Sequence, residues 1–239
     1  MMHGRSHEKG SALPIGNIVL AAITAIALVG VVWYIGGPRG MSSGKKTETS
    51  LRKNGENTRV EIDAGNAPSL GRHDAKIAIV EFADYQCPFC AVLHAGAEAA
   101  IIEEYVKKGK ARFTFKQYPF LGDESARAAS ASKCAQEQGK FWEYHDALFE
   151  RQTQSAEENA GVFSAENLKP IAGEVGLNIG MFEKCLASGK YTQAVLGEME
   201  EGRQAGVMNT PTMFINGRKT EGALTFDAYK AIIEDQLSR

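Results

Sequence analysis

The sequence is short of the features that mark a nucleic-acid-binding protein. Its 27 Lys and Arg residues are offset by 29 Asp and Glu residues, which gives a net charge of -2. No run of basic residues alternates with aromatic residues, although binding to nucleic acid depends on clustered positive charge. Nucleic acid is therefore excluded as the main partner. The chain also lacks internal repeats and long low-complexity tracts, and its composition is typical of a globular protein.

Charged residues are absent from residues 11–38. Within this segment the run from Ile15 to Ile35 is nearly all apolar, and about 20 such residues are enough to span a bilayer. The run is longer than the apolar region of a cleaved signal, about 7–15 residues, and no Ala-x-Ala-like site follows it. We expect a short tail at residues 1–14 and an uncleaved transmembrane anchor at residues 15–36. A cleaved signal with a long apolar core is the alternative.

Residues 37–56 consist mainly of Gly, Ser, Thr and charged residues. Such a composition is typical of a flexible linker that holds a domain away from the membrane. The basic residues in this segment outnumber those before the anchor, which favours a cytosolic domain by the positive-inside rule. That rule weakens for long folded domains, which cross the membrane despite their charge.

Cysteine is scarce, but two of the four cysteines stand close together in the segment Cys87-Pro88-Phe89-Cys90. This segment follows an apolar run, Ile77 to Phe82, that is typical of a strand covered on both faces. Pro88 suits the first turn of a helix, so Cys87 is expected at a helix N-terminus, where free N–H groups and the helix dipole favour an anion. A thiolate is the nucleophile of disulfide exchange. The pattern predicts a redox site, with a static disulfide or half of a zinc site as the alternatives.

The remaining pattern predicts an α/β fold. Residues 76–117 have the periodicity of strand, helix and strand, which implies a parallel pair. From Gly122 to about Ala205 the sequence changes to Ala-rich helical segments. After these, Asn216-Gly217 is the pair that tight hairpin turns prefer, and Thr225 is a suitable cap for a last helix.

This order of motifs resembles the DsbA-type thiol:disulfide oxidoreductases of the thioredoxin-fold superfamily. The resemblance is carried by Glu81, Cys87-Pro88-Phe89-Cys90 and Thr210-Pro211, and it covers about residues 57–239. It implies a thioredoxin-like α/β fold with an inserted helical domain, here preceded by the N-terminal transmembrane helix. The thioredoxin-like domain would comprise residues 57–121 and 206–239, and the helical insertion residues 122–205.

The resemblance also implies roles for the cysteines and the acid. Cys87 would be the exposed, attacking thiol, and Cys90 the more buried, resolving thiol. Glu81 would be a buried acid that helps move the proton of Cys90, with a pKa raised by desolvation. A surface carboxylate at a sheet edge is the alternative for Glu81. Asp84 is expected to be solvated, with at most a weak catalytic role.

On the same resemblance, Pro211 would be a cis-proline packed against the disulfide, with an ordinary trans turn proline as the alternative. The cis bond would expose the backbone of Thr210 for pairing with an extended substrate. Pro88 and Phe89 would contribute to the same substrate-binding surface. Phe89 is a departure, because the strongly oxidising members carry His between the thiols, and Phe cannot stabilise a thiolate by charge. We therefore predict a less oxidising reduction potential than the extreme of the family.

Cys134 and Cys185 are 51 residues apart in predicted helices. Some relatives carry a second bridge here, which implies a structural disulfide worth roughly 4 kcal/mol by loop closure. Two free buried thiols and a second redox-active pair are the alternatives. His145 is expected to be a hydrogen-bonded residue in an aromatic core, and His94 to be solvated.

The function that the resemblance implies is oxidation of cysteine pairs in exported, unfolded polypeptides, with a quinone-linked membrane partner that reoxidises the enzyme. Phe120, Leu121 and Met208 could line an apolar groove for such substrates, or pack into the core. No cofactor or metal is required. The catalytic domain would then be extracytoplasmic, on the periplasmic or cell-surface side. The alternatives are a reductase or isomerase on the same scaffold and, disfavoured by spacings of 44 and 51 residues between cysteines, a thiolate metal-binding module.

Overall fold

The computed structural model describes residues 51–52, 59–154 and 157–239. The predicted tail, the predicted anchor at residues 15–36 and all of the predicted linker except residues 51–52 lie outside these ranges. Among the helices of the described ranges, none combines the length and the apolar character that crossing a bilayer requires.

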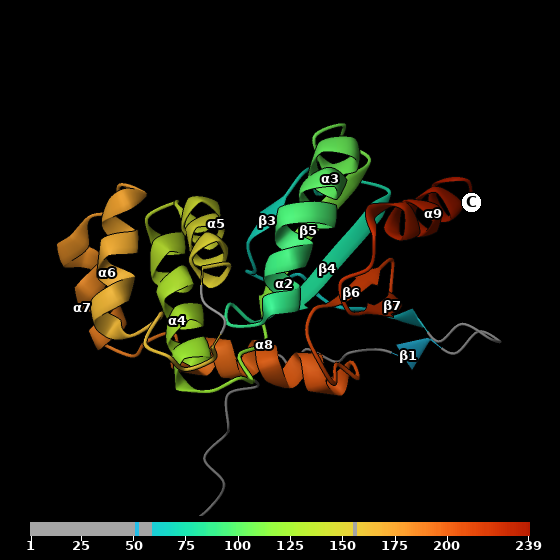
Figure 1. Ribbon diagram of the computed structural model, residues 1–239. Coiled ribbons are helices and arrows are strands. Elements are labelled where there is room, and N and C mark those ends of the chain that lie inside the picture. Colours follow the sequence, from blue (N-terminus) through green and yellow to red (C-terminus); the bar gives the residue numbers. More distant parts are fainter. Residues whose placement is uncertain (1–50, 53–58, 155–156) are drawn as a thin grey trace, which may run out of the picture. The chain divides into compact units, whose positions relative to one another are not determined.

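A five-stranded sheet in the order β3-β5-β4-β6-β7 forms the centre of the fold (Figure 1). The parallel pair that the sequence predicts is β4 and β5, and the other neighbours are antiparallel. The central strand β4 is buried at all but one position, as its apolar run predicts. The bounds are β3 Ser69–Leu70, β4 Ile77–Ala83, β5 Ala111–Gln117, β6 Thr212–Ile215 and β7 Arg218–Glu221.

Outside this sheet, the short strand β2, Arg59–Val60, pairs with β1, Leu51–Arg52. β3 was not predicted from the sequence. It is only two residues long and carries no periodic signal, and its position depends on pairing with β5.

The helical stretch after β4 is continuous but not uniformly α-helical. It comprises α2 Pro88–Leu93, η1 His94–Glu98, α3 Ala99–Ile101 and η2 Ile102–Val106, in which the two η segments are π-helical. Such wider turns are frequent at functional sites. Together with α9, Phe226–Leu237, this stretch covers one face of the sheet, where Ile79, Phe113 and Phe115 are fully buried.

The opposite face of the sheet packs against the end of α8, Thr192–Gln204. At Gly202 a Cβ atom would lie 2.8 Å from the ring of Tyr118 and 3.0 Å from that of Phe82, so only glycine permits this close approach. The nearly buried pair Lys116–Glu201, at 2.5 Å, adds a polar attachment between β5 and α8. These contacts hold the helical region firmly against the sheet.

The region between β5 and β6 is helical, as predicted, and Figure 1 shows its helices beside the sheet rather than within it. Ser164 and Asn178 cap α6 and α7 by accepting hydrogen bonds from Asn167 N and Met181 N. Besides α8, the helices of this insertion are α4 Asp123–Glu137, α5 Phe141–Gln152, α6 Ala165–Glu174 and α7 Ile179–Ala187.

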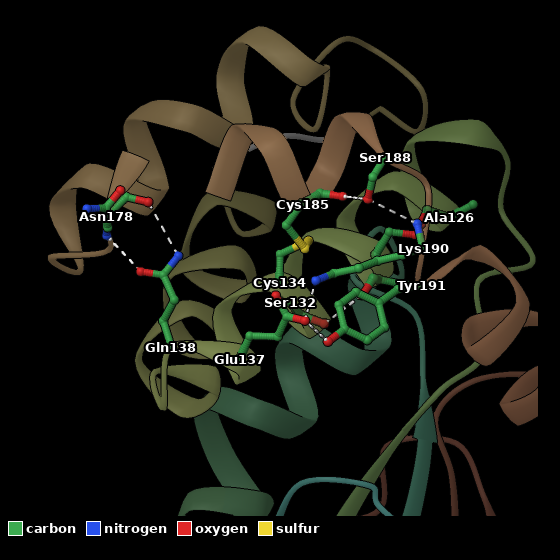
Figure 2. Close-up of a disulfide and its surroundings, with 12 residues drawn as sticks. Ala126, Ser132, Cys134, Glu137, Gln138, Asn178, Cys185, Ser188, Lys190 and Tyr191 are labelled. Atoms are coloured by element: carbon green, nitrogen blue, oxygen red, sulfur yellow. Dashed lines mark hydrogen bonds and ion pairs between the residues drawn. A yellow bond between two sulfur atoms is a disulfide. The ribbon is translucent and has the colours of Figure 1, made fainter. Parts of the chain in front are cut away.

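A disulfide joins Cys134 on α4 to Cys185 on α7, the two cysteines that the resemblance paired (Figure 2). Glu137, one turn after Cys134, accepts a hydrogen bond from Tyr191 and forms an ion pair with Lys190. The covalent bond and its polar neighbours therefore tie the first helix of the insertion to its later part.

The return to the sheet follows the predicted local signals. Asn216 and Gly217 have φ of +45° and +79°, as a type I′ turn requires, and they join β6 to β7. The Asn216 side chain also accepts a hydrogen bond from Ala78 N at 2.7 Å, which attaches the turn to β4. Thr225 then caps α9 by accepting a hydrogen bond from Ala228 N.

Candidate redox site

Cys87 occupies the N-cap of α2, with Pro88 in the first turn, as the sequence predicts. Both Cys87 and Cys90 are free thiols. The expectation that Cys87 is exposed is wrong, because only 4% of its surface is accessible, against 0% for Cys90. Its Sγ atom lies 3.3 Å from the carbonyl oxygen of Thr210, so the segment before β6 covers it.

The two thiols have opposite acidities. The hydrogen bond from Cys90, helped by the backbone N–H groups at the start of α2, outweighs burial and lowers the pKa of Cys87 to about 6. Burial raises the pKa of Cys90 well above its ordinary value, and the hydrogen bond and charge of Cys87 add to this. At neutral pH Cys87 is therefore a thiolate and Cys90 a thiol, which suits one for attack and the other for holding a proton.

Glu81 lies on β4 between Phe115 of β5 and Met213 of β6, and it is completely buried. Neither of its carboxylate oxygens has a hydrogen-bond partner among the described residues. Burial raises the pKa of Glu81 well above its ordinary value, and the negative charge of nearby Glu98 raises it further. Glu81 is thus a buried acid whose surroundings favour its neutral form, and the alternative of a surface carboxylate does not hold.

Another buried acid near the site, Glu98 of η1, was not predicted from the sequence. Its Oε1 atom lies 3.4 Å from His94 Nδ1 and 3.6 Å from His145 Nε2. Burial acts to raise the pKa of Glu98, but the two histidines outweigh it and lower the pKa to about 2. One signal was available, because Glu98 is three residues before Ile101 and seven before Tyr105, which is the inward helical spacing.

His94 was expected to be solvated but is half-buried, with its ring stacked on Phe149 at 5.0 Å. His145 is fully buried among aromatic rings and is hydrogen-bonded through Nδ1 to Tyr85 at 3.2 Å, in agreement with the expected role in the core. The stacking partner of His94 comes from α5, about 55 residues away, so a local pattern could not reveal it.

Asp84 was also expected to be solvated and is instead buried. Its carboxylate accepts hydrogen bonds from the backbone N–H groups of Gln86 at 2.8 Å, Phe120 at 2.9 Å and Leu121 at 3.1 Å. Burial outweighs these bonds and raises the pKa of Asp84. Asp84 therefore holds the loop after β5 against the segment that leads into Cys87, which is a structural role.

Exposed apolar side chains occur on three segments that lead to or form the site. Phe89 and Val92 on α2 are each 64% exposed, Phe120 follows β5, and Met208, 79% exposed, precedes Thr210. Leu121 is partly buried against the core, so the three residues suggested for a groove divide between surface and core. The Thr210–Pro211 peptide bond is cis.

Comparison with known proteins agrees with this fold. Residues 63–235 match the family described as Thioredoxin. Because this match covers more than half of the chain, the chain belongs to the thioredoxin family.

Individual relatives indicate which type of thioredoxin-family protein this chain is. The chain is 29% identical over 175 residues to the "Probable disulfide bond formation protein D" of Bacillus anthracis, covering 72% of this chain and 78% of that protein. The oxidised BdbD structure from Bacillus subtilis superposes with a TM-score of 0.67 at 27% identity, covering 72% of this chain and 94% of that one. The α-DsbA1 structure from Wolbachia pipientis, at 22% identity, 73% and 92% coverage and a TM-score of 0.65, shares the fold. The protein is a thiol:disulfide oxidoreductase of the DsbA type.

Proposed function

We propose that this enzyme oxidises cysteine pairs in exported, unfolded polypeptides through a Cys87–Cys90 disulfide. The single observation that carries the proposal is the opposite acidity of two neighbouring thiols at one helix start. A thiolate of low pKa at Cys87 is a good leaving group, which makes the disulfide a ready oxidant. The names of the Bacillus relatives, which refer to disulfide bond formation, support the same direction.

In this reaction a substrate thiolate attacks Cys87 Sγ, and the Cys87–Cys90 bond breaks as the mixed disulfide forms. Cys90 leaves as a thiolate and takes a proton, for which the buried acid Glu81 is the donor. The second substrate thiolate then attacks the substrate sulfur of the mixed disulfide. The substrate leaves with a new disulfide, and Cys87 leaves as a thiolate.

The substrate would lie along the backbone of Thr210, whose carbonyl oxygen already contacts Cys87 Sγ. An extended peptide is suited to this position, with Pro211 as the adjacent support. Exposed Phe89, together with Pro88 and the nearby Phe120 and Met208, would contact apolar side chains of an unfolded client. Such contacts favour unfolded chains, because folded proteins bury most of these groups.

The purified full chain, oxidised and mixed with a reduced unfolded polypeptide that carries one cysteine pair, tests this proposal. We expect loss of free thiols from the polypeptide, with one disulfide made per enzyme reduced. In Cys87→Ser the rate should fall by at least about 10³-fold, whereas Ser130→Cys, which adds a partly exposed thiol on α4, should not change it. Equal rates for the wild type and Cys87→Ser would refute the proposal.

The same scaffold would serve as a reductase or isomerase if its cellular partner kept Cys87 and Cys90 reduced. For the oxidase direction we propose a quinone-linked membrane partner and an anchor at residues 15–36. The extracytoplasmic part would be a thioredoxin-like domain at residues 57–121 and 206–239, with a helical insertion at residues 122–205. When intact cells are treated with protease, the domain should be cleaved once the cell envelope outside the inner membrane is made permeable. Protection that persists until the inner membrane is lysed would contradict this location.

A further inference from the structure

Several buried polar side chains lie close to one another beside the redox pair. Glu81 is close enough to Cys90 for its charge to act on that thiol, and Glu98 is close enough to act on Glu81. Beyond Glu98 a cavity of about 500 Å³ opens, lined in part by Glu98, His94 and Asp146. The buried acid therefore has one neighbour that reaches a space accessible to water.

In the part of the chain that the structure describes, Glu81 and Glu98 both have buried oxygen atoms without a hydrogen-bond partner, which suits the transfer of a proton between them. Among the described residues, buried side-chain atoms without a hydrogen-bond partner include both oxygens of Glu81 and Oε2 of Glu98. Such atoms are rare in folded proteins and require an explanation. A proton on Glu81 that is directed to Glu98 Oε2 would satisfy both carboxyl groups.

The other carboxylate oxygen of Glu98 faces groups that lie nearer the surface. Glu98 Oε1 lies 3.4 Å from His94 Nδ1, and His94 Nε2 lies 3.7 Å from Asp146 Oδ1, whose side chain is 64% exposed. His94, His145 and Asp146 bring possible metal-binding atoms within 4.8 Å of one another. However, His94 faces Glu98 with Nδ1 at 3.4 Å and Asp146 with Nε2 at 3.7 Å, so its two nitrogens face two different carboxylates rather than one shared ion.

We propose that Glu98 and His94 form a proton relay that exchanges the proton of Glu81, and through it that of Cys90, with water in this cavity. The inference deepens the proposed function and rests on it. Glu98 and His94 act as positioning residues, because neither touches the reacting sulfur atoms. His145 Nε2, on α5, lies 3.6 Å from Glu98 Oε1, while His145 Nδ1 is hydrogen-bonded to Tyr85.

The relay supplies the proton that Cys90 gains when the disulfide is reduced and removes it when the disulfide forms again. When the Cys87–Cys90 bond breaks, the Cys90 thiolate takes a proton from Glu81, Glu98 passes one from His94 to Glu81, and His94 recovers one from water. When the enzyme is reoxidised, Cys90 must lose that proton before it attacks, and the proton moves out by the same groups. The electron pairs move only between sulfur atoms.

The charged groups around Glu81, Glu98 and His94 favour transfer of a proton from His94 toward Glu81. Glu81 interacts electrostatically with groups on three elements. The charges of Glu98 on η1 and of Cys87 at the start of α2 raise the pKa of Glu81, and the charge of Glu81 acts in turn on Cys90 of α2 and Tyr229 of α9. The groups that act on Glu98 and its histidines include His94, His145, Asp146 and Tyr85. Burial acts to lower the pKa of His94, but the hydrogen bond and charge of Glu98 and the charge of Asp146 raise it above the ordinary value. These interactions favour the protonated form of His94, which suits it to donate a proton.

Chemical rescue of His94→Ala in the full chain tests the relay. The rate of reoxidation of the reduced enzyme by oxidised glutathione is measured from about pH 6 to pH 8, with and without added imidazole. We expect a loss of about tenfold or more, since positioned acid–base groups contribute about 10²–10⁴-fold. Imidazole should restore most of the rate, because the deleted ring leaves its space beside the cavity. The alkylation rate of Cys87, which needs no proton from Glu81, should stay within about twofold of the wild type.

Two further variants separate a relay from a packing effect. His94→Gln keeps a polar side chain that cannot titrate, so it should fold and still be slow. Glu103→Gln changes a carboxylate of the same cavity that pairs with Lys107 instead, and it should reoxidise at the wild-type rate. Wild-type rates in both His94 variants, or a loss that imidazole does not restore, would overturn the relay. A wild-type enzyme that fails to oxidise a test polypeptide would instead overturn the proposed function.

Discussion

The two cysteine pairs of this protein differ in their surroundings, not in their burial. Cys90 and Cys134 are 0% and 1% exposed, and Cys87 and Cys185 are 4% and 7% exposed. Yet one pair consists of free thiols at a helix start, and the other is a disulfide between two helices. Burial alone therefore does not decide what a cysteine does in this fold.

The polar groups around each pair make the difference. Near the disulfide, Glu137 is paired with Lys190 and Tyr191, and Gln138 accepts a hydrogen bond from Asn178 N (Figure 2). Near the free thiols, the carboxylate of Glu81 has no hydrogen-bond partner among the residues described. The polar side chains near the structural disulfide have hydrogen-bond or ion-pair partners, whereas the acid near the reactive thiols has none by geometry among the described residues. Such a difference is expected where a functional site is kept at some cost in stability.

The largest effect is expected from removal of the structural bridge. Cys134→Ala with Cys185→Ala opens a loop of 51 residues, which should lower the free energy of unfolding by about 4 kcal/mol. Urea unfolding at neutral pH measures this loss. The exchange rate per folded molecule should stay within about twofold, because the helix start at Cys87 is unchanged. A fall in that rate as large as the one from Cys87→Ser would mean that the two pairs exchange electrons and are not separate in role.

A smaller effect of opposite sign is expected at Glu81. Glu81→Leu removes a fully buried carboxyl group whose proposed partner is the neighbouring acid Glu98. Loss of its desolvation cost should raise the free energy of unfolding by about 1–3 kcal/mol while exchange becomes slower. Glu124→Leu is the matched control, because this buried carboxylate accepts hydrogen bonds from Gly161 N and Phe163 N, both at 2.7 Å. Its loss should destabilise the domain by a similar amount. Destabilisation by both variants would show that burial of Glu81 does not cost the folded domain free energy.

The pH dependence of the same variant has a definite sign. The pKa of Glu81 is raised in the folded protein, so its protonated form binds a proton that the unfolded chain has lost. The stability of the wild type relative to Glu81→Leu should therefore be greatest below the unfolded pKa and should be lost as pH rises through the folded pKa. Urea unfolding of both proteins between about pH 4 and pH 8 measures this difference. A constant difference would contradict the raised pKa.

Local signals in the sequence were enough to predict much of this arrangement. Pro88 after Cys87, the pair Asn216-Gly217 and the cap Thr225 each act within a few residues, and the structure contains the helix start, hairpin and helix that they predict. The thioredoxin-like fold with a helical insertion, which the family resemblance implied, was predicted correctly as well. The helix start, the hairpin and the helix cap, by contrast, each depend on the backbone of one short segment.

The features that were missed depend on contacts between distant segments. Asp84 is buried because the loop after β5 folds over it, and Glu98 is buried because His145 comes from another helix. The exposure of Cys87 was misjudged for the same reason, since Thr210 covers it from 123 residues away. Charged residues are mostly exposed, so a sequence pattern assigns such groups to the surface until the partner segment is known.

The smallest effect is expected from Phe89, which lies between the reactive thiols. Phe89→His should add a positive or hydrogen-bonding group beside the Cys87 thiolate, lower its pKa further and raise the reduction potential by about 30 mV, equivalent to about 1.4 kcal/mol. Val92→His is the control, because Val92 is equally exposed on the same helix but is not between the thiols. Equilibration with glutathione buffers measures both potentials. A wild-type value already near about -120 mV would contradict the predicted weaker oxidant.

The most direct test of the account is the pH profile of alkylation of Cys87 by iodoacetamide in the reduced full chain, with the labelled position identified by mass spectrometry. The account predicts a rate that rises with a midpoint at about pH 6, with Cys90 unlabelled over the same range. A midpoint near about 8.5, the value of a free cysteine, would contradict the claim that the helix start and Cys90 hold a thiolate at Cys87.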